Sequence, residues 1–264
     1  GYAANQRVVN MILKDKFAAT TVEVEGNGPG KGGSLGGQGE ASRFAVKGPQ
    51  RLNLKGSISG TTMLTEAERH LAQTSTTVST VAGDPDQAAA RSLISASNDA
   101  SLNATWSTGL GRGGLDGLIS ANAAVDRSNS HALSGLNVVV LTAPGGASAT
   151  RTFGDPLRRD TSTTTLQAGG SVLRQSGDWK LSLTTDLGHV ATDTRIERRA
   201  DTSAWVAAAA SGALAITGPL PTPAAAGFDT AHTISDTASL LATAVGRPVH
   251  LPAGDVSATF KAGY

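Results

Sequence analysis

The sequence has no cysteine, few aromatic residues and few charges. The absence of Cys among 264 residues excludes disulfides, thiolate metal sites and thiol catalysis. Charged residues make up 16% and aromatic residues 4%, so the chain has few large side chains with which to build a thick soluble core. The formal net charge of +1 gives no reason to expect nucleic acid or anionic lipid as a partner on charge alone.

Long hydrophobic runs are also missing. A membrane-spanning helix needs about 20 mainly apolar residues, and the longest uncharged runs lie near 128–150 and 202–228. The first is interrupted by Pro144-Gly145-Gly146 and the second by Gly218-Pro219. Neither run is a credible spanning helix. A chain without such helices spans a membrane only as a closed β-barrel.

The chain does contain a regular alternation of apolar and polar residues. From Trp179 the odd positions carry Trp, Leu, Leu, Thr and Leu, while the even positions carry Lys, Ser, Thr, Asp and Gly. A period of two residues is typical of a strand with one apolar and one polar face. The pattern predicts about nine strands, at residues 17–27, 38–48, 50–60, 99–110, 115–126, 163–174, 178–190, 233–246 and 255–264.

The lengths of these strands and of the links between them favour a membrane barrel. Strands near ten residues suit a tilted membrane strand better than the five or six residues usual in soluble sheets. Outer-membrane barrels have short turns on the periplasmic side and long extracellular loops. We expect short turns at 47–50, 111–114, 175–178 and 247–254, and long outer links at 28–37, 61–98, 127–162 and 191–232. The predicted fold is all-β, an incomplete antiparallel transmembrane β-barrel segment; a soluble β-sandwich or β-solenoid is the alternative.

The alternation also predicts which side chains share a face. In a barrel the apolar set points to lipid: Leu52, Leu54, Ile58, Leu102, Trp106, Trp179, Leu181, Leu183, Val256 and Phe260. The polar set points to the lumen: Asn53, Lys55, Asn103, Lys180, Asp186 and Lys261. A register shift of one residue would exchange the two sets.

A few segments match motifs of soluble enzymes. Gly-x-Ser-x-Gly at 32–36, with Ser34 at its centre, lacks the strand-to-helix context of a nucleophile elbow, and an esterase is a remote alternative. The five histidines are far apart in sequence and are expected in solvated loops, not in a metal site. Residues 65–71 and 84–91 are typical of short helix starts within a long loop, the second with Asp84 as N-cap. We expect no catalytic site and no cofactor.

The first fourteen residues resemble the end of the plug domain of TonB-dependent outer-membrane receptors. Gly1–Lys14 reads GYAANQRVVNMILK. In that family a Tyr-Gly element precedes a small-residue turn and a Val-Ile-Asn-Ile strand ending in Lys, and the barrel follows at once, as the alternating strand from Phe17 does here. The resemblance implies that residues 1–16 are the C-terminal end of a plug and residues 17–264 the N-terminal part of a barrel. Barrels of this kind have about 22 strands, so the chain is expected to be a fragment whose unpaired sheet edges make it aggregate alone.

The resemblance implies uptake of a scarce, bulky ligand across the bacterial outer membrane, and no enzyme activity. Siderophores, nickel chelates, cobalamin and oligosaccharides are the ligand classes of the family. Energy would come from the TonB–ExbB–ExbD complex, through a segment upstream of this chain. The predicted ligand contacts are Arg69, His70, His131, Arg151, Arg158, Arg159, Arg195, Arg198, Arg199 and Trp205. The arginines would attract anionic chelates; contact with outer-membrane lipid and lipopolysaccharide is the other interpretation. A surface adhesin or secreted β-solenoid binding protein is the alternative function.

Overall fold

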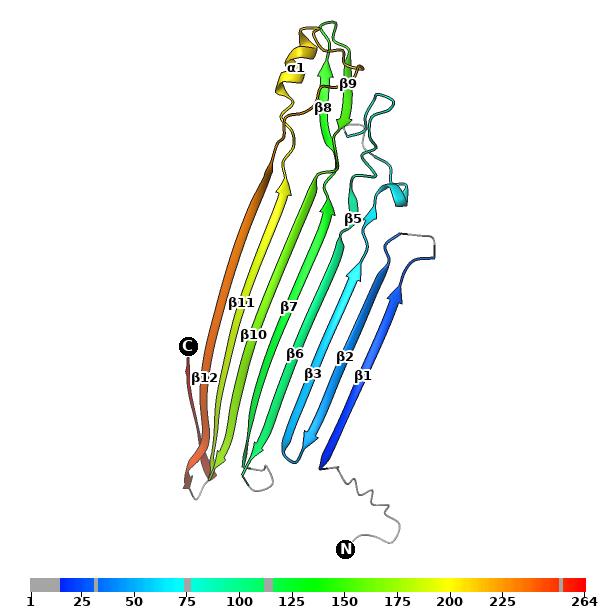
Figure 1. Cartoon of the computed structure of the whole chain (residues 1–264). Helices are drawn as coiled ribbons and strands as arrows, with labels where there is room; N and C mark the ends of the chain where they lie inside the picture. Colours follow the sequence, from blue (N-terminus) through cyan, green and yellow to red (C-terminus); the bar gives the residue numbers. More distant parts are fainter. Residues whose placement is uncertain (1–14, 31–32, 74–76, 112–115, 252–253) are drawn as a thin grey trace.

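One nine-stranded antiparallel sheet dominates the computed structural model, which describes residues 15–30, 33–73, 77–111, 116–251 and 254–264 (Figure 1). The fourteen residues of the plug resemblance lie outside this described part. The sheet order is β1-β2-β3-β6-β7-β10-β11-β12-β13. Its strands are β1 (Lys16–Asn27), β2 (Gly36–Lys47), β3 (Gln50–Thr61), β6 (Ala96–Leu110), β7 (Gly117–Leu133), β10 (Arg158–Ser176), β11 (Trp179–Glu197), β12 (Phe228–Leu251) and β13 (Gly254–Gly263).

The sheet is a meander in which each strand pairs with its neighbours along the chain. In the described residues, the turns between β2 and β3 and between β10 and β11 are tight and lie at the lower end of Figure 1, whereas long links leave the strands at the upper end. Gly48 and Gly177 lie in two of the tight turns with φ of 57° and 58°, a conformation that glycine adopts without steric cost. All nine predicted strands are therefore confirmed, and so is the all-β fold. Within the described residues β1 and β13 each pair on one side only, so the sheet is open.

Several strands run further than the alternation predicts. β7 and β11 continue seven residues above their predicted upper ends, and β10 and β12 begin five residues before their predicted starts. Both faces are polar in these extensions, so the sequence there shows no period of two. At its lower end β12 continues to Leu251, with a bulge between Gly246 and Val249, where a link at 247–254 was expected. That expectation was wrong because the bulge restores pairing with β13 after one extra residue.

The pairing register shows which side chains share a face, because residues directly opposite in neighbouring strands point to the same side. Trp106 lies opposite Leu52 and Ala121, and Leu183 lies opposite Val172 and Ala242. The predicted division into an apolar and a polar set is confirmed. We call the side carrying the predicted apolar set the apolar face and the other side the polar face.

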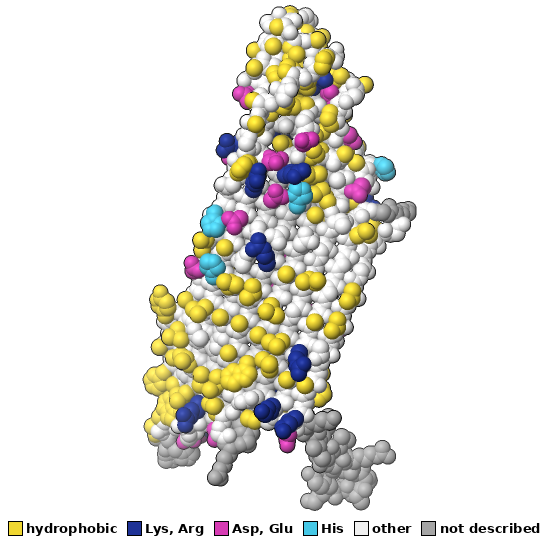
Figure 2. Space-filling model, in the orientation of Figure 1, with side chains coloured by type: hydrophobic (Ala, Val, Ile, Leu, Met, Phe, Trp, Pro, Cys, Tyr) yellow, Lys and Arg dark blue, Asp and Glu magenta, His cyan; other side chains and the backbone are white. Residues whose placement is uncertain are grey.

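The apolar face carries a band of exposed hydrophobic side chains across the sheet, interrupted in β2 by the exposed Arg43, which lies opposite Leu54. On this face, β11 carries no charged side chain from Trp179 to Leu187, and β7 carries none from Gly117 to Val125. We call this zone the apolar band; Figure 2 shows it in the lower part of the sheet, with charged side chains and histidines above it. Its side chains are not covered by protein: Val24 is 85% exposed and Ile58 67% exposed.

Hydroxyl, amide and charged side chains cover most of the polar face. The hydroxyls of Ser57 and Ser101 lie 2.7 Å apart, as do those of Ser120 and Ser171. Lys55 forms an ion pair with Glu40 at 2.8 Å. These cross-strand contacts link neighbouring strands on the side away from the apolar band.

The buried hydrophobic core lies in the long links above the sheet. The links carry β4 (Leu64–Thr65), a 3-10 turn η1 (Ala67–Arg69), β5 (Ser92–Ile94), β8 (Asn137–Thr142), β9 (Ser148–Phe153) and α1 (Ser203–Ala210). The hairpin β8–β9 and α1 enclose a cluster of Val139, Leu141, Phe153, Trp205 and Ala209. We call residues 136–157 and 199–220, with segment 78–91 packed against them, the cap.

Two helix expectations in the links need correction. Residues 84–91 form turns and not a helix, because the Asp84 carboxylate bonds Arg151 of β9 instead of capping a helix. Residues 65–71 contain only the three-residue turn η1. The sequence analysis did not predict α1. Among the described residues, no helix is long and apolar enough to cross a membrane.

Replacement of Gly246 by Ala is expected to destabilise the lower end of the sheet. The Trp179 ring lies over Gly246, so an added Cβ would lie 2.3 Å from Trp179 Cδ2 and would displace the ring from its stacking on Phe260. We expect a loss of about 1–3 kcal/mol in the free energy of unfolding, measured by chemical denaturation. Gly26→Ala is the control, because nothing lies within 4 Å of its added Cβ. Equal stability of both variants would contradict the ring contact.

Candidate functional site

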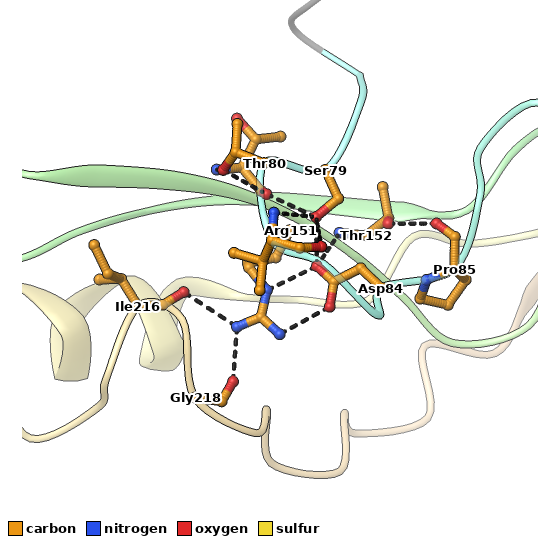
Figure 3. A network of polar contacts seen from close by, with 10 residues as sticks. Ser79, Thr80, Asp84, Pro85, Arg151, Thr152, Ile216 and Gly218 are labelled. Atoms are coloured by element: carbon orange, nitrogen blue, oxygen red, sulfur yellow. Dashed lines mark hydrogen bonds and ion pairs between the residues drawn. The ribbon is translucent and has the colours of Figure 1, made fainter.

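Arg151 ties together three long links of the cap. It lies in β9, within the link from β7 to β10, and its guanidinium donates to both oxygens of Asp84 at 2.7 and 2.8 Å (Figure 3). Asp84 belongs to the link from β3 to β6. Arg151 Nη1 also donates to the carbonyl oxygens of Ile216 and Gly218, at 3.1 and 2.8 Å, in the link from β11 to β12. One side chain thus fixes the relative positions of three links.

The clamp formed by Arg151 and Asp84 is buried and fully hydrogen-bonded on its acidic side. The two side chains are 6% and 9% exposed. Asp84 also accepts bonds from the Ser79 hydroxyl at 2.6 Å and the Thr152 backbone N–H at 3.3 Å. Hydrogen bonding by Arg151 lowers the pKa of Asp84 below its ordinary value of 3.8. The Asp84 carboxylate is therefore held ionised. Because the Arg151 guanidinium is bonded to it and to two carbonyl groups, this arginine is not available to a ligand.

The other predicted ligand residues are distributed over the cap and both faces of the sheet. Trp205 is 9% exposed and packs against Phe153 with ring centroids 4.7 Å apart, so it is part of the cap core. Arg198 forms an ion pair with Asp229. Arg195 lies over the Phe228 ring at 3.8 Å. Arg199 contacts the Leu136 carbonyl at 3.5 Å.

The remaining predicted residues do not gather in one place. Arg69 lies beside Gly33, and His70 follows η1 with a φ of 50°. Arg158 is on the apolar side of β10 and Arg159 on the polar side, because neighbouring residues in a strand alternate. The arrangement brings His131 and Arg195 to one depression, and it does not form a single cluster of free guanidinium groups. Ligand binding by the ten residues stays a prediction.

Three His–Asp pairs lie on the apolar face above the apolar band. Their ring Nδ1 and carboxylate oxygen atoms are 2.5–2.6 Å apart, and each pair is directly opposite in neighbouring strands. The pairs are His131–Asp160, His189–Asp236 and His232–Asp193. The expectation that these histidines lie in loops was wrong, because the strands continue above the band. A depression of about 500 Å³ runs between two of the pairs, His131–Asp160 and His232–Asp193.

No arrangement for metal binding or nucleophilic catalysis is visible in the part of the chain that the structure describes. No group of three or more His, Asp or Glu side chains there is placed to hold a metal ion. The Ser34 hydroxyl donates to the Thr62 carbonyl at 2.6 Å. This bond joins the ends of two links and does not place the hydroxyl beside a histidine.

The comparisons with known proteins add no identity. No protein-family model, curated protein or solved structure matches this chain.

Proposed function

We propose that the sheet is part of a transmembrane β-barrel in the bacterial outer membrane, in a receptor of the TonB-dependent type. The observation that carries this proposal is the apolar band. Nine residues of β11, from Trp179 to Leu187, separate the lower end of the sheet from the first charged pair above. At ~3.3 Å per residue and a tilt of ~40°, nine residues span roughly 23 Å. That height matches the lipid-facing band of outer-membrane barrels, which is about 25 Å.

The band has no protein to cover it within the described residues. Soluble monomers rarely expose contiguous apolar patches of more than a few hundred Å², and this band crosses all nine strands. The opposite face is lined by hydroxyl and amide groups, which suit a water-filled or plugged lumen. Lipid on one side and polar contents on the other give the hydrophobic side chains of the band a matching environment, and Arg43 of β2, opposite Leu54, is a charged exception.

The connectivity also supports a barrel over the alternatives. Every pairing in the sheet is antiparallel between successive long strands, with tight turns at one end and long links at the other. This is the arrangement of outer-membrane barrels. A parallel β-helix solenoid repeats a short coil and pairs its strands in parallel. Additional strands from the rest of the protein would pair with the open edges of β1 and β13 and close the sheet.

The transport step rests on the resemblance of residues 1–14 to the end of a plug. In this proposal the cap and the upper ends of the strands meet the bulky ligand outside, and the TonB–ExbB–ExbD complex supplies energy through the upstream segment. Among the predicted contacts, Arg158 and Arg159 are two cations at the upper end of β10 whose side chains point to opposite faces. No bond-forming chemistry is needed for this function.

Leu183→Arg is expected to weaken membrane insertion of the full-length protein. Leu183 lies near the middle of the apolar band, 44% exposed and opposite Val172 and Ala242. A cation near the bilayer midplane costs about 2–4 kcal/mol, measured as the free energy of folding into lipid vesicles. The matched control is Ser182→Arg, one residue away on the polar face.

The control variant should fold with a smaller loss, because its side chain points to the lumen. Heat-modifiable mobility in detergent then reports whether each variant has formed a barrel. Equal losses in the two variants, or a wild-type protein that is monodisperse in buffer without detergent, would contradict the barrel.

A further inference from the structure

A depression on the polar face lies over β3, β6 and β7, toward the lower end of the sheet. Its volume is about 580 Å³, within the range of pockets that hold small ligands. Arg51 and Asn53 line it from β3, Asn103 and Thr105 from β6, and Asn122 from β7. Asn53 and Asn122 each lie directly opposite Thr105, so the three strands bring one row of polar side chains to the depression.

The carboxamide groups at this depression are not used by the fold. Among the described residues, the side chains of Asn53, Asn103 and Asn122 form no hydrogen bond. Each carboxamide offers both donors and an acceptor. The Phe44 ring lies opposite Asn53, 40% exposed and with its centroid 6.4 Å from that of Phe17. Amides and hydroxyls beside an exposed ring suit a molecule that carries many hydroxyl groups and an apolar C–H face.

The charge of the polar face above the depression disfavours an anionic ligand. On the strands that the structure describes, this face holds no Lys or Arg between the row of Lys55 and Arg159. Lys55 itself is neutralised by Glu40 at 2.8 Å. Four carboxylates of the same zone have no ion pair among the described residues: Glu23, Glu25, Asp99 and Asp126. An anionic chelate that moves down this face would therefore be repelled.

Neutral hydroxyl groups cover the neighbouring strands of the same zone. Ser128, Thr163, Thr192 and Thr233 form one row across β7, β10, β11 and β12. Within this row only the hydroxyls of Thr163 and Thr192, 3.1 Å apart, are bonded to each other among the described residues. Such a surface exchanges hydrogen bonds with water or with a hydroxylated ligand and does not require a charged one.

We propose that the depression is a binding site for an uncharged oligosaccharide, and that this is the ligand class of the receptor. The carboxamides of Asn53, Asn103 and Asn122 bond the sugar hydroxyls, and the Phe44 ring packs against the C–H face of a sugar ring. Arg51 adds donors at the lower edge. The proposal rests on the proposed function, because the polar face is then the wall of the lumen through which the ligand passes.

The test uses the full-length protein in detergent and counts bound probe by native mass spectrometry. The neutral probes are linear hexasaccharides of α-linked glucose, β-linked glucose, xylose and mannose. The anionic probes are a hexagalacturonate and a ferric tris-catecholate. Asn53→Leu, Asn103→Leu and Asn122→Leu each remove one carboxamide and keep a side chain of similar size. Gln167→Leu is the matched control, an exposed amide on the polar face of β10 that does not line the depression.

We expect the wild type to bind at least one neutral hexasaccharide and neither anionic probe. Each Asn→Leu variant should lower the occupancy of that sugar about fivefold or more, because a sugar hydroxyl loses its partner, and Gln167→Leu should leave it unchanged. Binding of no neutral probe, preference for an anionic probe, or equal occupancy in all five proteins overturns the site.

Heat-modifiable mobility, measured on the same samples, separates this proposal from the barrel. A variant that keeps this mobility and loses the sugar supports the site. A wild type that has the mobility and binds no sugar overturns the site alone, whereas a wild type that lacks it contradicts the barrel itself.

Discussion

A cysteine placed at Gly145 is expected to react with a membrane-impermeant maleimide on intact cells, whereas one at Asp178 is expected to react only after the outer membrane is permeabilised. Gly145 lies in the turn between β8 and β9, at the outer end of the cap, and nothing lies within 4 Å of an added Cβ. Asp178 lies in the tight turn between β10 and β11 at the other end of the sheet. The apolar band separates the two positions, so we expect them to be exposed on opposite sides of the membrane.

These 264 residues contain no cysteine, so each variant adds the only thiol within them. The expected difference in labelling is close to all-or-none. Cysteine at Ser148, near the same turn, serves as a second outer position. Reaction at both ends on intact cells would mean that the sheet does not cross a membrane. Reaction at Asp178 alone would mean that the barrel crosses it in the opposite direction.

Removal of the Arg151 side chain is expected to open the cap while leaving the sheet intact. Arg151→Met leaves the Asp84 carboxylate buried without its cation, and breaking a buried pair in this way costs about 3–5 kcal/mol. The carbonyl groups of Ile216 and Gly218 also lose their donor. Hydrogen exchange of backbone amides in β8, β9 and α1 should accelerate roughly a hundredfold or more, while exchange in the lower half of β10 and β11 stays unchanged.

The double variant Asp84→Leu/Arg151→Met separates the loss of charge balance from the loss of packing. It removes both charges, so we expect it to recover much of the stability that Arg151→Met loses. The pH dependence follows from the lowered pKa of Asp84. Because the folded-state pKa lies below 3.8, the clamp stabilises the cap fully above that pH and loses its contribution as the pH falls through the folded-state pKa. Unchanged amide exchange in Arg151→Met would contradict the clamp.

The sequence predicts the sheet well where one face is apolar and the other polar. β3, β6 and the lower part of β11 alternate cleanly because the apolar face and the polar face carry opposite kinds of side chain. Above the band this division ends. From His189 to Glu197 both faces of β11 carry polar groups, so no period marks the strand. The pairing of His189 with Asp236 depends on the register between β11 and β12, which local sequence does not specify.

The cap was not predictable from local pattern, because its contacts join segments far apart in the chain. The carboxylate that pairs with Arg151 is 67 residues away. Trp205 is in a run of small residues that looks like a loop, and only the arrival of Phe153 from β9 makes it a core residue. Exposed-looking loop residues were therefore assigned to ligand binding, whereas several of them hold the cap together.

The clamp around Arg151 also sets an order of assembly. The hairpin β8–β9 is continuous in sequence, so it can form early and without lipid. The hairpin can contact Asp84 and α1 only when three separate links lie together at the upper end of the sheet. We expect this to require that the strands below have already paired. We therefore expect Arg151 to make its bonds last. Once formed, the cap holds together the upper ends of β6, β7, β10, β11 and β12. Formation of the cap would therefore fix the register of strands that have already paired.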